Sequence, residues 1–189
     1  MRKKKCAVCK TSFMPDRPFQ AVCSVPCAIE QAKGNRERLL QKKEKEEKKE
    51  DRKKKEALKT ARDYIKDAQA YFNSYVRVRD KLQTCICCGK PLNSNGSAVG
   101  GAYDAGHYRS VGSAPHMRFD ENNCHAQRKQ CNQWGAGRAV DYRIGLIKRI
   151  GLAEVERIES DQTPRHYTIE QLKEIISTYK RKRKELENG

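Results

Sequence analysis

Cysteine spacing gives the first chemical signal in this sequence of 189 residues. Cys6-x-x-Cys9 is followed, after thirteen residues, by Cys23-x-x-x-Cys27. Each pair can place two sulfur atoms on one side of a tight turn, and a tetrahedral zinc ion would then close the loop between the pairs. The spacing therefore predicts a four-cysteine zinc knuckle at the N-terminus, with unliganded cysteines as the alternative.

A second group of metal-binding residue types occupies residues 85–132, which hold five of the nine cysteines and three of the four histidines. Cys85-x-x-Cys88 has the spacing of another zinc knuckle, because two intervening residues let both sulfur atoms face one ion. Cys87 is then the spare thiol. We expect Cys131 to supply a third ligand, so the core would be held together by structural zinc.

The fourth ligand of this second site is harder to assign from spacing. A second Cys-x-x-Cys knuckle ending at Cys131 would need sulfur at position 128, where the sequence has Arg128. Cys124 is the substitute, but on one continuous helix it would lie about 10.5 Å from Cys131, too far to share an ion. Cys124 can serve only if it precedes the helix and the chain bends back. A three-ligand or vestigial zinc site is the alternative.

Charge and composition indicate the partner. Lys and Arg number 41 against 24 Asp and Glu, a net charge of +17, which favours a polyanion such as nucleic acid because binding releases condensed counterions. No apolar run approaches the ~18 residues of a membrane helix, and no apolar segment follows the basic residues 1–5. We therefore expect no membrane partner and a reducing compartment, where paired cysteines bind metal more often than they form disulfides.

The elements that would position these residues form a mainly helical α+β chain in four parts. With 34% charged and 37% hydrophobic residues, the chain cannot bury one large core. We predict the N-terminal knuckle over residues 1–33, a long charged helical arm over 34–82, a small zinc-stapled core over 83–138, and C-terminal helices with a basic tail over 139–189.

The arm has two halves of different character. Residues 42–56 are fifteen consecutive charged residues, nine basic and six acidic, and opposite charges four apart favour a solvated helix over a disordered linker. Gly34 and Asn35 could interrupt the helix near its start. From Leu58 to Val76 apolar residues recur every three or four positions, which predicts a packing face. It would cover the core, or pair with a second copy in a homodimer.

In the core, residues 102–110 predict a short strand that carries His107, and residues 119–123 a turn into a helix over about 124–134. The C-terminal part predicts helices over 140–150 and 152–158, separated by Gly151. A last helix over about 168–186 begins with the capping box Thr168-x-x-Gln171. Its basic residues 180–184 either form a solvated helix end or bind DNA.

This order of elements resembles the HNH, or ββα-metal, nucleases: a knuckle, a strand bearing a histidine, an Asn-containing loop, and a zinc cysteine followed directly by Asn. Along its whole length the chain is similar to the NinG, or Rap, recombination proteins of lambdoid phages. The similarity includes the N-terminal cysteines, Asp-Ala-Gly-His-Tyr-Arg, Arg-Phe-Asp-Glu-Asn-Asn-Cys-His-Ala-Gln and Cys-Asn. The resemblance implies a structure-selective endonuclease for branched DNA, such as D-loops and Holliday junctions, working in the cytoplasm of an infected bacterium.

Phosphodiester hydrolysis needs an activated water and a cation near the phosphate. His107 is the expected base, Asn132 and Asp104 are the expected ligands of Mg or Mn, and Asn123 is expected to brace the loop that orients the histidine. The HNH pattern usually has an acidic or histidine ligand directly before the base, where this chain has Gly106; Asp104 lies on the same strand face as that position. Asp120, Glu121 and His107 itself are alternative ligands.

Basic residues spread through the core suit contacts with phosphates on either side of a cut. They are Arg109, Arg118, Arg128, Lys129 and Arg138. His116 and His125 are expected to be ordinary surface or packing histidines. The alternative function is a non-catalytic zinc-containing DNA-binding protein that anneals or remodels recombination intermediates, which would not need the set of Asp104, His107 and Asn132.

Overall fold

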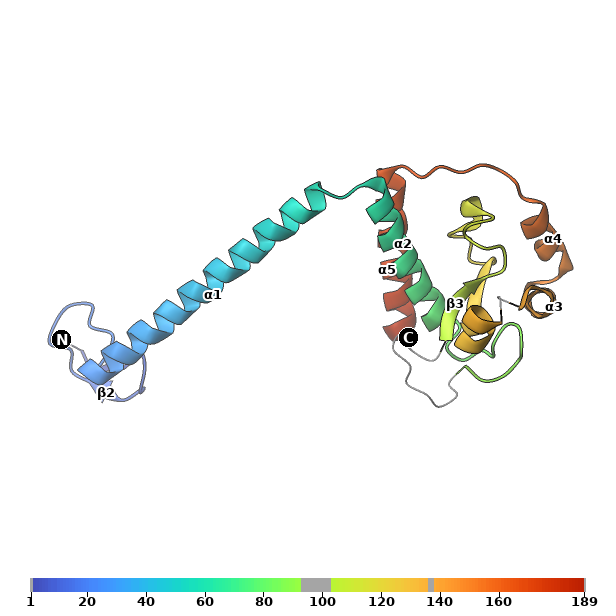
Figure 1. Ribbon diagram of the computed structural model, residues 1–189. Helices are drawn as coiled ribbons and strands as arrows, with labels where there is room; N and C mark the ends of the chain where they lie inside the picture. The colour runs from blue at the N-terminus through green and yellow to red at the C-terminus, as the bar shows by residue number, and fades with distance from the viewer. Residues whose placement is uncertain (1, 93–102, 136–137, 189) are drawn as a thin grey trace. The chain divides into compact units, whose positions relative to one another are not determined.

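The structure is a computed structural model that describes residues 2–92, 103–135 and 138–188. The chain divides into two compact units, Met1–Leu58 and Lys59–Gly189 (Figure 1). This boundary falls inside residues 34–82, for which the sequence predicts a single arm. None of the helices in the described part of the chain combines the length and the apolar character needed to cross a membrane.

The first unit consists of a small ribbon and one long helix. Strands β1 (Lys4–Lys5) and β2 (Ser12–Phe13) pair antiparallel, and α1 spans Val25–Ala57. The helix has no buried residue, so its charged residues are solvated on every side. The predicted helix is thus present through the charged run, and Gly34 lies inside it without interrupting it.

A break in the predicted arm separates α1 from α2 (Ala61–Arg79). The Thr60 hydroxyl accepts a hydrogen bond from the Asp63 backbone N–H, and the Asp63 carboxylate accepts one from the Thr60 N–H at 3.0 Å. This capping box satisfies two free donors at a helix start, so it begins a new helix. The prediction of continuous helix to residue 82 is therefore wrong at residues 58–60.

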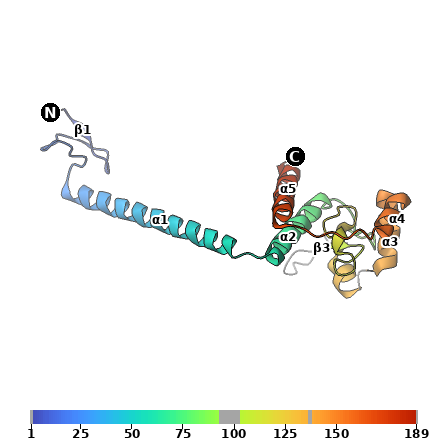
Figure 2. The ribbon, with the colours of Figure 1, turned by 90° about the horizontal axis from the view of Figure 1, so that it is seen from above.

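In the second unit α2 packs along α5 (Ile169–Asn188), and the views of Figures 1 and 2 show the two helices side by side. The apolar face of α2 supplies buried Ala68, Phe72 and Val76, which meet Leu172 and Tyr179 of α5. The predicted packing stripe is confirmed from Ile65 to Val76, where it is covered within the same unit. Its predicted first residue, Leu58, is 81% exposed and lies outside α2. The capping box of Thr168 at the start of α5 is also confirmed, since Thr168 and Gln171 exchange backbone-to-side-chain hydrogen bonds.

The sheet of the core has two antiparallel strands, β3 (Tyr103–His107) and β4 (Cys124–Arg128). His107 pairs with Cys124, and Tyr103 with Arg128. The helix predicted over 124–134 is therefore wrong in its first half: a lone buried strand would leave its backbone groups unpaired, and residues 124–128 supply the missing partner. Helical structure begins only at η2 (Gln130–Trp134), a short π-helix.

The remaining helices confirm the predicted C-terminal elements and hold the knuckle of Cys85 in place. Helices α3 (Ala139–Ile150) and α4 (Leu152–Ser160) meet at Gly151, whose φ of +86° suits a residue without a side chain. They enclose a second apolar core around Tyr142. Gly145 of α3 lies so close to the knuckle that an added Cβ would meet the Ile86 carbonyl oxygen at 1.8 Å.

Candidate functional site

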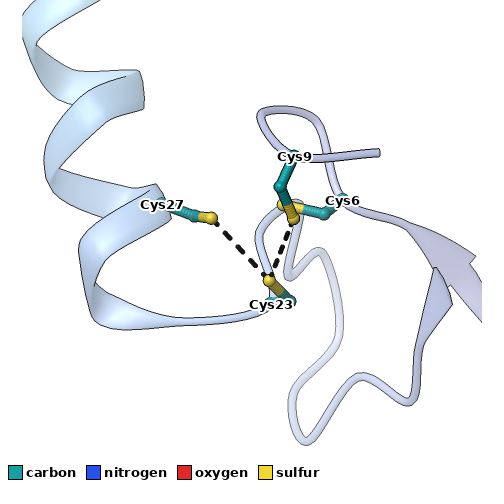
Figure 3. Close-up of side chains that lie close together, drawn as sticks. All are labelled: Cys6, Cys9, Cys23 and Cys27. Atoms are coloured by element: carbon teal, nitrogen blue, oxygen red, sulfur yellow. Dashed lines mark hydrogen bonds between the residues drawn. The ribbon is translucent and has the colours of Figure 1, made fainter. Parts of the chain in front are cut away.

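The four N-terminal cysteines form one thiol cluster (Figure 3). The ligand sulfurs of Cys6, Cys9, Cys23 and Cys27 all lie within 4.8 Å of one another, with Cys9 to Cys23 at 3.5 Å and Cys23 to Cys27 at 3.8 Å. Disulfide sulfurs are about 2 Å apart, whereas sulfurs around a tetrahedral zinc at about 2.3 Å are separated by nearly 4 Å. These spacings fit a structural metal such as zinc.

Local backbone geometry brings these thiols together. The turn after Cys6 closes with a hydrogen bond from the Lys10 N–H to the Cys6 carbonyl, and Cys27 lies on the first turn of α1. Burial opposes ionisation of the Cys6 thiol, but backbone N–H groups of Cys23, Val8 and Cys9 outweigh it and lower the pKa of Cys6 to about 6. A thiol that ionises readily is suited to metal binding, because the thiolate is the ligand.

The second thiol cluster contains Cys87. The sulfurs of Cys85, Cys87 and Cys131 lie within 4.8 Å of one another, and Cys88 packs against this group. Cys85 is also the acceptor for the Arg128 backbone N–H at 3.3 Å. A hydrogen bond with Cys87 is the largest cause that lowers the pKa of Cys85, to about 4. The structure therefore places the supposed spare thiol inside the cluster.

Cys124 does not join this cluster in the structure. It is fully buried on β4, and its sulfur lies 3.7 Å from Nδ1 of His107. Burial raises the pKa of the Cys124 thiol well above its usual value, so it is a neutral thiol. Because residues 124–128 are strand and not helix, the helical distance expected between Cys124 and Cys131 does not apply. Position 128 contributes a backbone N–H to Cys85 in place of sulfur.

His107 occupies the end of β3 and is held on two sides. Its Nε2 lies 3.0 Å from the Arg118 carbonyl oxygen, which can only accept, so the proton sits on Nε2 and leaves Nδ1 as an acceptor. The ring packs against Phe72 at a centroid distance of 6.0 Å. Burial lowers the pKa of His107, so its imidazole is neutral at pH 7.

Asn123 is fully buried behind this histidine and ties down the loop that follows β3. Its Oδ1 accepts from the Arg109 backbone N–H at 2.8 Å, and its Nδ2 donates to the carbonyl oxygens of Arg109 and Met117. The loop so held presents the Arg118 carbonyl to His107. These hydrogen bonds tie Asn123 to the loop that it is predicted to brace, and its role in orienting a catalytic histidine stays a prediction.

Asp104 and Asn132 meet at the other end of β3. Asn132 Nδ2 and Gln133 Nε2 donate to the same Asp104 oxygen, at 3.1 and 2.9 Å. Gln133 is a neighbour that the sequence pattern did not single out. Both side-chain amides act as hydrogen-bond donors to the carboxylate in this arrangement. If either side-chain amide rotates by about 180°, its oxygen takes the place of its nitrogen.

The structure does not bring His107 to this pair. Successive side chains of a strand alternate between faces, so Asp104 and His107, three residues apart, project from opposite faces of β3. Their Cα atoms are separated by about 10 Å along the strand. Of the predicted set, Asp104 is in contact with Asn132, and Asn123 supports the loop over His107.

Three of the arginines predicted to bind phosphate have side-chain contacts within the protein. Arg109 donates to the Ile158 and Asp161 carbonyls, Arg118 donates to Gln69, and Arg138 forms an ion pair with Asp141. Arg128 is half-buried at the end of β4, and Lys129 is half-buried just before η2. Contacts of these five residues with DNA remain a prediction.

A buried charge cluster lies outside the residues that the sequence predicted for the site. Asp80 is 4% exposed and accepts from Arg79 and from the Ala126 backbone N–H, with Arg149 at 3.7 Å. His125 donates its Nε2–H to the Asn122 carbonyl, and its Nδ1 accepts a hydrogen bond from Arg79. With one nitrogen donating and the other accepting, His125 is a neutral packing histidine. His116 likewise donates to the Asp161 carbonyl.

Comparison with known proteins covers the whole chain. A family model described as Bacteriophage Lambda NinG protein matches residues 1–189. Protein ninG of Salmonella phage P22 is 40% identical over 199 residues, spanning 100% of this chain and 95% of that protein. Protein ninG of Escherichia phage lambda is 39% identical over 199 residues, spanning 100% and 94%. No solved structure matches the chain. The chain belongs to the NinG family of bacteriophage proteins.

Proposed function

We propose that this protein is a structure-selective DNA endonuclease that cuts branched recombination intermediates, such as D-loops and Holliday junctions, by metal-dependent hydrolysis. The observation that carries the proposal is the contact of Asp104 with Asn132, which gathers a carboxylate and an amide from β3 and η2. The sequence of a thiol cluster, two antiparallel strands and a short helix supports an HNH-like core.

Each proposed residue has one task. Asp104 and Asn132 hold a Mg or Mn ion, which supplies positive charge to the phosphate and the leaving oxygen. His107 is the proposed base. Since its Nε2–H is held by the Arg118 carbonyl, it would take the proton of the attacking water at Nδ1, and the water would have to replace the Cys124 thiol that lies 3.7 Å from this atom. Asn123 holds the loop that carries this carbonyl. The positive net charge of +17 draws the protein to DNA.

The base and the cation ligands form two separable parts of the proposal. In this conformation a water molecule beside Asp104 does not also reach His107, because about 10 Å of strand lies between them. The same separation favours the second candidate function, a non-catalytic zinc-containing DNA-binding protein that anneals or remodels recombination intermediates. Variants of Asp104 and His107 therefore need separate measurement.

The test is cleavage of an end-labelled four-way junction by the purified full chain in Mg or in Mn. We expect the wild type to cut, and Asp104→Asn and His107→Ala each to cut at least about 100-fold more slowly, the usual contribution of such groups. His166→Ala is the matched control, because His166 is exposed and lies outside the site. It should cut like the wild type.

Three results would change the assignment. Binding without cutting in every divalent ion supports the annealing or remodelling protein and ends the nuclease proposal. Cutting by His107→Ala at the wild-type rate removes this histidine as the base. Cutting by Asp104→Asn at that rate removes the carboxylate as a cation ligand. Each variant should keep the wild-type circular dichroism spectrum, which shows that it is folded.

A further inference from the structure

We propose that Trp134 stacks on an unpaired nucleobase where branched DNA departs from the double helix. This inference rests on the proposed DNA partner and adds a residue that recognises the branch. Trp134 is 78% exposed at the end of η2. It directly follows Asn132 and Gln133, the two residues that donate to Asp104.

The backbone that carries Trp134 is anchored on both sides. Cys131 is buried in the second thiol cluster, and Asn132 and Gln133 are bound to Asp104. On the other side the Gly135 carbonyl oxygen accepts a hydrogen bond from the Arg138 backbone N–H at 3.0 Å. The indole is therefore displayed from a fixed turn and needs little further ordering on binding.

The exposure of this indole is unusual within the unit. Every other aromatic side chain that the structure describes in the second unit is buried or half-buried, including Phe72, Phe119 and Tyr142. An indole has the largest apolar surface of the aromatic side chains, and leaving it in water gives up the gain from burial. The fold does not use Trp134 for packing, so its apolar faces are available to a ligand.

A nucleobase at a branch has the chemistry that fits this site. Every base has a flat π-face that stacks on an aromatic ring without regard to sequence, and the phosphates on either side are attracted to a basic surface. Lys129 and Arg138 flank η2 in sequence, and the chain carries a charge of +17. Bases inside an intact duplex already stack on one another. An exposed indole therefore favours DNA whose bases are unpaired.

Fluorescence of the full chain gives a direct test, because Trp134 is the single tryptophan in the sequence. Three DNAs are titrated without added Mg or Mn: a four-way junction with two unpaired nucleotides at the crossover, the same junction with abasic sites there, and a linear duplex of equal length. Anisotropy of a label on the DNA reports binding separately. We expect strong quenching of tryptophan emission by the first junction only.

Variants measure the contribution of stacking to affinity. Trp134→Ala should weaken binding to the junction with unpaired nucleotides by about 5- to 150-fold, the range for loss of one base stack, and leave duplex binding unchanged. Trp134→Phe keeps a ring and should retain most of the affinity. Leu82→Ala is the matched control, since Leu82 is 90% exposed but has no ring. It should bind like the wild type.

The outcomes separate this inference from the proposed function. Binding by anisotropy without quenching, or equal quenching by duplex and junction, overturns the stacking role even if the enzyme cuts. Emission that depends on protein concentration in the absence of DNA also overturns it, because a second copy would then cover the indole. Quenching specific to the unpaired bases supports the inference even if no metal ion permits cutting.

Discussion

The positions of Cys87 and Cys124 determine which thiols of the second cluster can bind a metal ion. Cys87 lies 3.6 Å from Cys85 and receives the Gln127 side-chain N–H at 3.0 Å, whereas Cys124 faces His107 across the sheet. Spacing in the sequence favours the pair Cys85 and Cys88 as ligands, because spacing takes account only of the turn that contains both residues. The position of Cys131 relative to that turn depends on the tertiary fold, which is why the sequence could not assign Cys87.

Zinc content should therefore respond to Cys87 and not to Cys124. We expect wild-type protein to release two zinc ions per chain on treatment with a thiol-blocking mercurial, measured with a colorimetric zinc indicator. Cys87→Ser should bind the second ion more weakly and lose it on dialysis. Cys124→Ser should keep both ions. Loss of zinc from Cys124→Ser, with full retention in Cys87→Ser, would show that the ligand set is the one predicted from sequence.

Asp80 makes stability depend on pH. Burial opposes its ionisation, but hydrogen bonds from Arg79 and the Ala126 backbone N–H, together with the charge of Arg79, hold the pKa of its carboxyl well below the usual range. A depressed folded pKa adds stability above the unfolded pKa of about 3.9, and this stability is lost as pH falls toward the folded value. The neighbouring charged groups are Arg79 and Arg149.

We expect Asp80→Asn to lower the free energy of unfolding at pH 7 by about 3 kcal/mol, because it leaves Arg79 without its partner in a buried pair. The difference from the wild type should shrink below about pH 4, because Asp80 of the unfolded chain takes up its proton there while the folded carboxylate stays ionised. Urea unfolding monitored by near-ultraviolet circular dichroism at several pH values measures it. A difference that is constant from pH 7 to pH 3 would exclude the ion pair as its cause.

Among the elements, α3 lies close against the backbone of the Cys85 knuckle. Gly145 lets this helix approach the knuckle backbone, where a Cβ would meet the Ile86 carbonyl oxygen at 1.8 Å, while a Cβ added at Gly34 of α1 would have no atom within 4 Å. The same substitution should therefore have opposite effects at these two positions. A main-chain carbonyl cannot rotate away as a flexible side chain can.

Gly145→Ala should destabilise the second unit by about 1–3 kcal/mol through overpacking, and lower its thermal unfolding midpoint. Gly34→Ala should stabilise α1 by about 0.5–1 kcal/mol, because alanine loses less backbone entropy in a helix. Hydrogen exchange of amides in α1 and in α3 measures the two effects separately. Unchanged exchange in α3 of Gly145→Ala would mean that the helix shifts without loss of stability.

Periodicity predicted the elements that have a regular apolar face or a recognisable cap. The helices around Phe72, Tyr142 and Leu172 were identified in this way, and the Thr168 capping box located the last helix. The strand β4 was missed because its side chains are almost all buried, so it shows no alternation of polar and apolar residues. The Thr60 cap was missed because the charged run continues close to it.

For the whole molecule, the predicted binding of DNA depends on how the excess positive charge is distributed over the two units and not on any one basic residue. Lys and Arg exceed Asp and Glu by nine in residues 1–58 and by eight in residues 59–189. Each unit therefore carries about half of the excess. The predicted attraction to polyanions rests on composition alone, whereas the separation of His107 from Asp104 follows from strand geometry that only the structure reveals.

DNA binding should fall steeply with salt, because each neutralised phosphate releases condensed counterions. We expect the plot of log affinity against log salt to be markedly steeper for the full chain than for residues 59–189. The difference in slope between the two proteins should be similar for junction and duplex DNA. Anisotropy titrations between about 50 and 200 mM NaCl measure the slopes. Equal slopes would show that the first unit does not contact phosphates.

The outer edge of β4 is covered by groups from other segments. Arg79 donates to the Cys124 carbonyl, Asp80 accepts from the Ala126 N–H, and the Ile86 N–H donates to the Ala126 carbonyl. An uncovered strand edge is a template on which another chain can add a strand and begin aggregation. The end of α2 and the knuckle therefore leave no room along this edge of β4 for a strand from another chain.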